Sequence, residues 1–416
     1  MSDKIKIFTI SDHPLSPSGV GTQTKYMIEG MLKTGKYQFV SFGGAISHPD
    51  HNPQKTEKWD EDWIIWPVDG YGNPDQVRAM IGQQKPDILW FMTDPRFYEW
   101  LWGIENEIRA QVPMVYYHVW DNYPYPHFNK PYYDSNDHIA CISKLTYDIV
   151  QNVAPDVDST YLPHAVDMDI FKKVDSPLLN DFTKGRFDPD KFYFFWNNRN
   201  ARRKQSGTLI FWFKKFLDEV GHDKAVLIMH TEPKDPNGQD LEAIIAELGL
   251  KNGEVLFSRE KMDAANLALL YNAVDCTINI SDAEGFGLAT LESLACETPI
   301  IVNLTGGMQD QITDGTTTFG IGIEPTSKAV IGSQTVPYIY EDRLSEADVV
   351  GAMKEMFLKS QEERDELGRL GREYALKQFN FETFMERWDE LLTKVYEEKG
   401  SWETRTGYKS YGVEVL

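Results

Sequence analysis

Cysteine and positive charge are both scarce in this chain. Three cysteines occur among 416 residues, at a spacing that fits no metal-binding motif. Cys141, Cys276 and Cys296 each lie in or beside an apolar segment, so we expect buried thiols and a reducing compartment. Basic residues number 42 against 64 acidic ones, and the net charge of −22 argues against broad binding to nucleic acid or to an anionic membrane surface.

Long apolar runs and a secretory leader are missing as well. No apolar run reaches the roughly 18 residues of a membrane-spanning helix, and the segment MSDKIKIFTIS at the start contains no signal-peptide core. We therefore expect a soluble, cytoplasmic protein without a transmembrane segment. The motifs HExxH and GxSxG do not occur, and the first turn lacks GxGxxG. These absences argue against a metallopeptidase, a serine hydrolase and a plain dehydrogenase.

Short β-rich runs alternate with amphipathic helical segments, and the series occurs twice. In the first series we expect strands at 4–11, 37–42, 87–93, 112–119 and 138–142 and helices at 22–33, 75–84, 97–110 and 144–153. In the second we expect strands at 191–197, 225–230, 254–258, 275–281 and 299–303 and helices at 207–220, 239–249, 263–273, 287–296 and 347–378. This alternation predicts an α/β protein with two doubly wound parallel sheets. Prolines interrupt the pattern near 155–190, where we expect the domain boundary, and 320–343 is expected to be a loop-rich insertion.

The segment EGFGLATLE (284–292) joins an expected strand to an expected helix through a glycine loop. Backbone N–H groups at such a helix start favour an anion, typically a phosphate. Glu284 stands before the glycines and Glu292 follows on the helix, and each carboxylate can accept hydroxyl hydrogen bonds. A phosphate flanked by two hydroxyl-rich ends describes a nucleotide sugar. The alternative is an ordinary glycine turn followed by a solvated glutamate.

A basic cluster, RNARRK (199–204), follows the expected strand KFYFFWN. Arg199 and Lys204 are five residues apart, so one turn of chain can bring both to a diphosphate. A solvated basic helix start is the alternative.

Two weaker candidates lie in the first half of the chain. Gly19 and Gly21 open the first helix, where their amides could reach a phosphate, although a glycine turn explains them equally well. His118 ends an apolar strand and precedes many aromatic residues. It is either a core histidine or a residue that contacts a sugar or an acceptor.

Taken together, these motifs resemble a known family. The segment SDAEGFGLATLESLACETPIIV (281–302) closely resembles the E-x7-E signature of glycosyltransferase family 4, the retaining group 1 enzymes with the GT-B fold. Further similarities are the SGVGTQ loop (18–23), His118, LPHAVDMDIF (162–171), the Arg199 and Lys204 pair, and MDAANLALLYNAVD (262–275).

The resemblance implies a role for each site residue. Glu284 would contact the donor sugar near its reacting carbon, and Arg199 and Lys204 would stabilise the diphosphate leaving group. His118 would lie near sugar and acceptor. The implied donor-binding residues are Gly19, Gly21, Gly285, Phe286, Gly287, Leu288 and Glu292, the last of which would hold the ribose hydroxyls.

The resemblance also implies the architecture and the reaction. Two Rossmann-like domains would face a central cleft, with 1–165 as the acceptor-side domain, completed by 381–416, and 166–380 as the donor domain. A hexosyl unit would pass with retention from a UDP- or GDP-sugar to a hydroxyl of a carbohydrate, glycolipid, protein or small molecule, without a metal or other cofactor. Nucleic acid is not an expected partner.

Some residues depart from the family pattern, and other functions stay open. Gly19-Val20-Gly21 replaces a usual glycine pair, and His164-Ala165 replaces a usual Asn-Gly. Cys296-Glu297 stands where a glycine is common. A nucleotide-sugar epimerase on the same fold and a non-catalytic nucleotide-sugar-binding protein are the alternatives; a phosphorylase lacks its pyridoxal-phosphate lysine signature.

Overall fold

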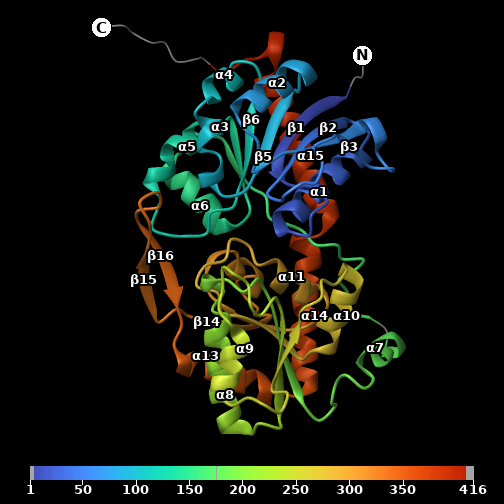
Figure 1. The fold of residues 1–416 in the computed structure, drawn as a ribbon, viewed down its shortest axis with the longest axis vertical. Coiled ribbons are helices and arrows are strands. Elements are labelled where there is room, and N and C mark those ends of the chain that lie inside the picture. Colours follow the sequence, from blue (N-terminus) through green and yellow to red (C-terminus); the bar gives the residue numbers. More distant parts are fainter. Residues whose placement is uncertain (1–3, 175, 409–416) are drawn as a thin grey trace. The chain divides into compact units, whose positions relative to one another are not determined.

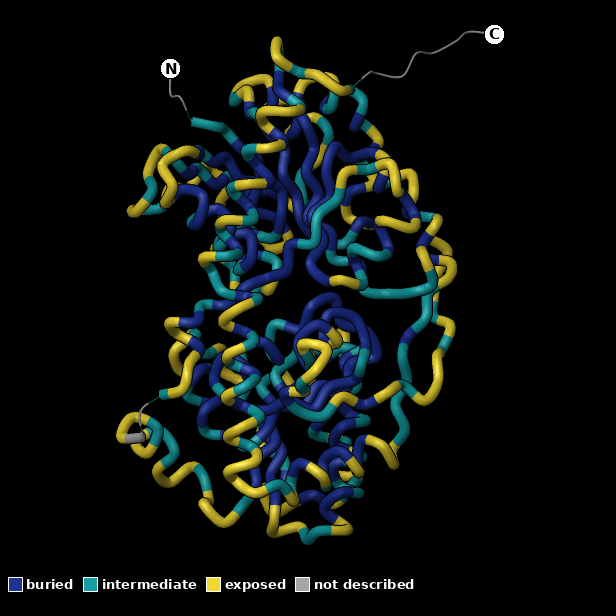
Figure 2. Tube along the Cα trace, turned by 180° about the vertical axis from the view of Figure 1, so that it is seen from behind, coloured by how far each residue is buried: buried dark blue, intermediate teal, exposed yellow. Residues whose placement is uncertain are grey.

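The computed structural model describes residues 4–174 and 176–408, and it divides into two compact units (Figure 1). Unit 1 comprises Met1–Ala165, Gly332–Tyr338 and Phe381–Leu416, and unit 2 comprises Val166–Ile331 and Ile339–Asn380. Each unit contains its own sheet, whose buried strands run inside exposed loops (Figure 2). Among the described residues, no helix is both long and apolar enough to cross a membrane.

Unit 1 is built on an eight-stranded sheet with the order β3-β4-β2-β1-β5-β6-β7-β8. Its strands are β1 (Ile5–Asp12), β2 (Tyr37–Gly44), β3 (Gln54–Lys55), β4 (Trp63–Pro67), β5 (Ile88–Met92), β6 (Met114–His118), β7 (His138–Cys141) and β8 (Ser159–Tyr161). All pairs are parallel except β3 with β4. Every residue of β5 and β6 is buried, as expected for central strands covered on both faces.

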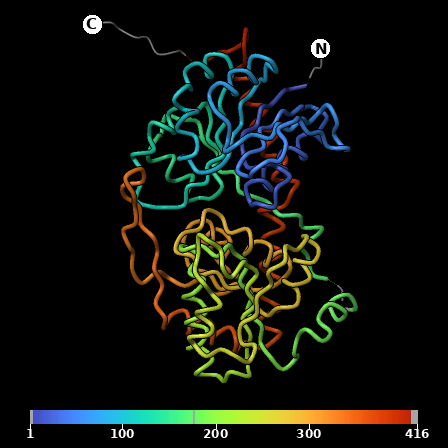
Figure 3. Tube along the Cα trace, in the orientation of Figure 1, coloured from blue at the N-terminus to red at the C-terminus, as the bar shows by residue number. Residues whose placement is uncertain are grey.

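The helices of unit 1 come from both ends of the chain. They are α1 (Gly19–Lys33), α2 (Pro74–Gln84), α3 (Glu99–Trp102), α4 (Glu105–Arg109), α5 (Lys130–Asp134), α6 (Lys144–Val153) and α15 (Phe381–Lys399). Figure 3 shows the red α15 beside the blue N-terminal elements of this unit. The Tyr26 ring of α1 lies 4.5 Å from Phe381, and a side chain at Gly30 would collide with Met385.

Unit 2 contains a six-stranded parallel sheet with the order β11-β10-β9-β12-β13-β14. The strands are β9 (Phe192–Asn197), β10 (Ala225–His230), β11 (Val255–Ser258), β12 (Cys276–Asn279), β13 (Ile300–Asn303) and β14 (Gly320–Ile323). The helices are α7 (Ser176–Thr183), α8 (Ser206–Val220), α9 (Leu241–Glu247), α10 (Ala264–Ala273), α11 (Leu288–Ala295), α12 (Gln309–Ile312), α13 (Glu346–Leu358) and α14 (Gln361–Gln378). Phe194, Phe213 and Phe216 anchor its core.

Three expectations from the sequence were wrong in detail. The helix expected over 347–378 is two helices, because Ser360 and Glu363 form a capping box that starts α14. The helix expected over 97–110 is likewise split into α3 and α4. The segment 320–343 is not mainly loop: it contains β14 and a hairpin of β15 (Ser327–Ile331) and β16 (Ile339–Arg343). The glycines of β14 hid this strand, yet Gly320 lies against Ile300 so closely that no larger residue fits.

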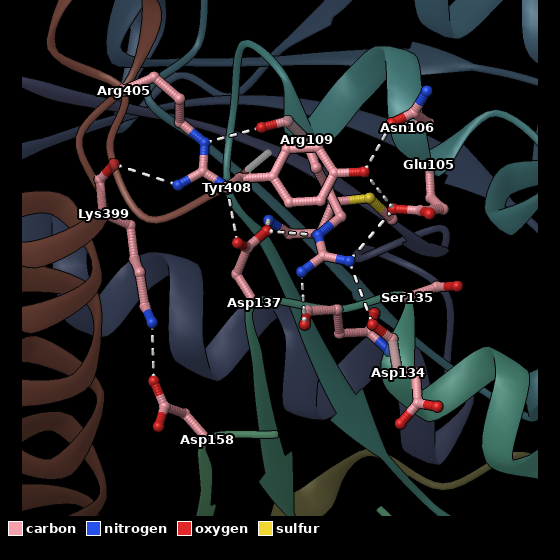
Figure 4. A network of polar contacts seen from close by, with 12 residues as sticks. Glu105, Asn106, Arg109, Asp134, Ser135, Asp137, Asp158, Lys399, Arg405 and Tyr408 are labelled. Atoms are coloured by element: carbon pink, nitrogen blue, oxygen red, sulfur yellow. Dashed lines mark hydrogen bonds and ion pairs between the residues drawn. The ribbon is translucent and has the colours of Figure 1, made fainter. Parts of the chain in front are cut away.

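The segment after α15 is tied to unit 1 by a buried network of charges (Figure 4). Arg405 Nη2 donates to Asp137 Oδ1 over 2.6 Å, and Arg109 Nε donates to Asp137 Oδ2 over 3.0 Å. The side chains of Arg405 and Asp137 are each 4% exposed. Tyr408 packs over the Arg109 guanidinium and donates its hydroxyl proton to Asn106. The C-terminal segment is therefore an integral part of this unit.

Replacing Arg405 should destabilise unit 1. Loss of one partner of a buried ion pair costs about 3 kcal/mol, whereas the more exposed pair of Lys399 with Asp158 should contribute less than about 1 kcal/mol. Urea unfolding of Arg405→Ala and of the control Lys399→Ala measures both effects. Equal midpoints for the two variants would contradict this assignment.

Candidate functional site

The candidate residues of unit 2 meet at the carboxyl ends of two neighbouring strands. β9 ends at Asn197 and β12 at Asn279, and these strands pair in the middle of the sheet. The chain after β9 carries Lys204 in a 3₁₀ turn (Arg202–Lys204), and the chain after β12 carries Glu284. Because carboxyl ends of parallel strands share one edge, residues eighty positions apart lie together where open α/β sheets bind ligands.

Lys204 and Glu284 form a buried ion pair. The Lys204 Nζ contacts Glu284 Oε2, and the two residues are only 8% and 9% exposed. Burial by itself raises the pKa of Glu284, but the charges of Lys204 and Arg203 outweigh it and hold this pKa below its usual value. The carboxylate is therefore ionised at neutral pH.

The glycine loop leads into α11 with an open helix start. Gly287 is the N-cap residue, with φ of 91°, and it supplies no side-chain cap. Gln311 Nε2 donates to the carbonyl oxygens of Phe286 (2.7 Å) and Gly287 (3.1 Å), which fixes the direction of these peptide groups. The first N–H groups of a helix need partners from outside it, so this start can accept an anion.

A second glycine loop supports the first. After β13 the chain reaches Gly306, where φ is 51° and a side chain would collide with the Glu284 carbonyl oxygen. The Gly307 N–H donates to the same oxygen over 3.0 Å. Glycine is required at Gly306 because two backbones approach closely there. The sequence LTGGMQ after an apolar run was an available signal for this loop.

Glu292 stands at the other end of the loop and has its own partners. Tyr271 donates its hydroxyl proton to Glu292 Oε2 over 2.8 Å, and Asn197 Nδ2 donates to the Tyr271 hydroxyl oxygen over 2.9 Å. Burial raises the pKa of Glu292 to about 7, although the Tyr271 hydrogen bond works in the opposite direction. The sequence had not identified Tyr271 and Asn197 as neighbours of this glutamate.

Arg199 lies apart from the Lys204–Glu284 pair. Its guanidinium forms two hydrogen bonds to Asp235, 2.7 Å from Nε and 3.2 Å from Nη2, and its side chain is 64% exposed. Asp235 follows β10, on the other side of β9 from β12. The structure thus holds the two expected phosphate-binding cations on different carboxylates.

The candidates in unit 1 are less available than expected. The Gly21 N–H donates to the Ser18 side chain over 2.9 Å, so this amide already caps α1, whereas Gly19 is exposed. The His118 ring is fully buried between Tyr116 and Tyr133. Its Nδ1 accepts the Trp120 N–H, while Nε2 has no hydrogen-bond partner among the described residues. Burial lowers the pKa of His118 to about 3, so the ring is neutral.

The three cysteines and the other metal-binding residue types were also located in the described chain. No group of histidine, cysteine or acidic side chains in the described chain could hold a metal ion. Cys141, Cys276 and Cys296 are buried free thiols, as their apolar surroundings predicted. Burial raises the pKa of each thiol, which keeps it protonated.

The raised pKa of Glu292 predicts a pH-dependent penalty on stability. The folded chain retains this proton up to about pH 7, whereas the unfolded chain loses it near 4.5. The stability gained by holding the proton is therefore full below about pH 4.5 and is lost as the pH rises through about 7. Glu292→Gln should gain melting temperature over the wild type between about pH 5 and pH 8.

The exposed glutamate Glu247 provides a control for this measurement. Thermal melts of Glu247→Gln at pH 5 and pH 8 measure how far the exchange of an exposed carboxylate for an amide moves the melting temperature. A pH-independent difference between Glu292→Gln and the wild type would show that Glu292 does not titrate in this range.

The segment that carries these residues is similar in sequence to known glycosyltransferases. The model of the family described as glycosyl transferases group 1 matches residues 180–334. The D-inositol 3-phosphate glycosyltransferase of Paenarthrobacter aurescens is 30% identical over 134 residues, which cover 31% of this chain and 31% of the relative. The enzyme of the same name from Acidothermus cellulolyticus is 38% identical over 85 residues, 20% of this chain and 17% of its own. The match thus spans less than a third of either relative.

Solved structures are similar over nearly the whole chain. Sucrose-phosphate synthase from Thermosynechococcus elongatus has a TM-score of 0.74 at 16% identity, covering 95% of this chain and 100% of that chain. A Rickettsia africae glycosyltransferase has a TM-score of 0.71 at 15% identity, with 95% and 100% covered. Anabaena HepE, solved in complex with UDP and glucose, has a TM-score of 0.67 at 13% identity, with 94% and 100% covered.

These findings confirm the family resemblance and the fold class that the sequence predicted. The fold class is supported by the two sheets, which are parallel except for β3, and by solved structures that match along nearly the whole chain. The family rests on the segment that carries Lys204, Glu284 and Glu292. The chain has the α/β architecture of the GT-B fold, and its residues 180–334 match the model of the group 1 glycosyl transferases.

Proposed function

We propose that the protein is a retaining glycosyltransferase that moves a hexosyl unit from a UDP- or GDP-sugar to an acceptor hydroxyl. The buried Lys204–Glu284 pair beside the uncapped start of α11 carries this proposal. A buried pair of this kind is costly to desolvate, and apolar residues in its place would be as stabilising or more so, so its position at the sheet edge favours a functional reason. The group 1 family match over this segment supports the same activity.

Different residues of the site would bind the diphosphate, the sugar and the ribose of the donor. Lys204 and the amides from Gly285 to Leu288 would take the diphosphate, because an ammonium and helix-start N–H groups both favour anions. Glu284, released from Lys204, would accept hydroxyl protons of the sugar, and Glu292 those of the ribose. Within this proposal UDP is the favoured donor nucleotide, since the similar Anabaena structure was solved with UDP and glucose.

The chemistry requires stabilisation of the leaving group. The bond from the anomeric carbon to the diphosphate oxygen breaks, and the acceptor oxygen bonds that carbon from the same face. The departing phosphate oxygen takes the acceptor proton, so no protein base is needed. Lys204 and the loop amides stabilise the charge that develops on the diphosphate, and the loss of such a group typically costs 10²–10³ in rate. These side chains and amides could serve without a divalent metal.

Three of the expected residues would need a local rearrangement before they could take part. Arg199 would reach a diphosphate only after it leaves Asp235. The neutral His118 could donate its Nε2 proton to a sugar or acceptor hydroxyl, but the aromatic residues that cover its ring would have to open. Gly19 and Gly21 stay predicted phosphate contacts, and the Gly21 amide would first have to release the Ser18 side chain.

Donor turnover tests the role of the pair. A screen of UDP- and GDP-sugars for nucleotide release should identify a donor, and Lys204→Ala should then lower turnover about 10²–10³-fold. The double variant Lys204→Met/Glu284→Gln leaves no unpaired buried charge, so it should fold and be equally inactive. Lys251→Ala, which changes an exposed lysine of unit 2, is the control and should keep normal turnover. Near-normal turnover in both site variants would disprove the assignment.

The stereochemistry of the product separates the proposal from its alternatives. Proton NMR of the product should show that the anomeric configuration of the donor is kept. An inverted product would exclude the proposed front-face attack. Conversion of the donor sugar without any acceptor would instead identify an epimerase, and donor binding without turnover would identify a binding protein.

A further inference from the structure

The hairpin of β15 and β16 is inserted between β14 and α13 (Figure 1). The family match ends at residue 334, so β16 lies wholly beyond it. Most of β15 is exposed, including Val330 at 62%. β16 differs: Glu341 is only 3% exposed, and the strand ends against the two loops that carry Lys204 and Glu284.

Glu341 holds the loop after β9. Arg202 Nη1 donates to Glu341 Oε2 over 2.8 Å and Arg202 Nη2 to Oε1 over 2.5 Å, a two-pronged contact with fixed geometry. Arg202 and Lys204 belong to the same 3₁₀ turn. The orientation of this turn, and with it the position of the Lys204 ammonium, is thus tied to β16.

Arg343 holds the loop after β12. Its Nη1 lies 2.7 Å from Asp282 Oδ2, and its Nη2 donates to Glu341 Oε2 over 3.0 Å. Asp282 stands two residues before Glu284. A backbone hydrogen bond joins the same two segments, because the Asp342 N–H donates to the Asp282 carbonyl oxygen over 2.9 Å.

The two loops are also joined directly through Asp282. Gln205, the residue after Lys204, has φ of 56° and donates its Nε2 proton to Asp282 Oδ2 over 2.5 Å. The Asp282 N–H donates to the Arg203 carbonyl oxygen over 2.8 Å. Side chains therefore form one continuous path around the Lys204–Glu284 pair, and its members are Arg202, Glu341, Arg343, Asp282 and Gln205.

These charged contacts are better explained by a role in positioning the two loops than by a role in stabilising the hairpin. Apolar residues at the base of a hairpin would stabilise it at least as well as buried charges do, because charges must be desolvated. Planar guanidinium contacts instead fix distances and angles. The path reaches one residue from Lys204 and two residues from Glu284, where small displacements change the geometry of the pair.

We propose that β16 is a positioning element of the donor site, in which Glu341 and Arg343 hold the two loops so that Lys204 and Glu284 are placed for sugar transfer. The claim rests on the proposed function of that pair. Arg343 and Glu341 are positioning residues, since they act through Arg202 and Asp282. The insertion would in this way contribute to catalysis from outside the matched family segment.

Hydrogen exchange tests the positioning without any knowledge of the donor. Arg343→Ala should speed amide exchange in residues 281–287, because Asp282 loses its guanidinium partner, and to a smaller extent in residues 200–206, because Glu341 loses the arginine that helps to hold it. Lys328→Ala, which removes a charge from the neighbouring strand β15, is the matched control and should leave both loops unchanged. Unchanged exchange in Arg343→Ala would overturn the proposal.

Turnover with the donor found in the screen gives the second readout. Arg343→Ala should lower kcat about 10²-fold, as expected for a small misplacement of reacting groups, with KM nearly unchanged, and Arg343→Lys should restore part of the rate. The double variant Arg343→Ala/Asp282→Ala should cost little more than the worse single variant, because both act along one path.

The outcomes separate the two proposals. Faster exchange with normal kcat, or full additivity in the double variant, would overturn the positioning role while the transferase function stands. Faster exchange in a protein that turns over no nucleotide sugar would overturn the transferase function and, with it, the claim that β16 positions residues for transfer.

Discussion

The ion pair between Lys204 and Glu284 is the constraint on which the site depends. A lone charge at either position would be strongly unfavourable in so buried a place, so each residue requires the other. The pair joins the loops after β9 and β12, which are adjacent strands in the sheet. Strand order, loop length and the close approach at Gly306 all serve to bring these two side chains together.

The two glutamates of the glycine loop differ in charge state because their surroundings differ. Arg203 and Lys204 keep Glu284 ionised, whereas Glu292, eight residues later, has a pKa near neutrality because burial dominates there. Between them the uncapped start of α11 offers N–H groups to an anion. One loop thus presents a charged carboxylate, an uncapped helix start and a titratable carboxyl in sequence, and the proposed donor would place its sugar, diphosphate and ribose along it in that order.

The sequence predicted the fold class and ten strands, because alternating apolar runs and amphipathic helices are local signals. It also indicated that Glu284 and Lys204 lie at strand ends. It missed β3, β4 and β8 of unit 1, of which β4 is a short apolar run that was a local signal. It also missed strands that depend on distant contacts: β14, whose glycines are explained only by their packing on β13, and the hairpin strands, whose partners are each other. It likewise grouped Arg199 with Lys204 by spacing, whereas Asp235, thirty-six residues away, holds the Arg199 guanidinium. The Ser360 capping box was a local signal that could have divided the long helix.

A crystal structure of the protein with a bound nucleoside diphosphate would test the account most directly. We expect the diphosphate within hydrogen-bond distance of Lys204 Nζ and of the amides at the start of α11, with the ribose hydroxyls on Glu292. Glu284 would then face the space beyond the terminal phosphate. A diphosphate bound elsewhere, with Lys204 still on Glu284, would contradict the account.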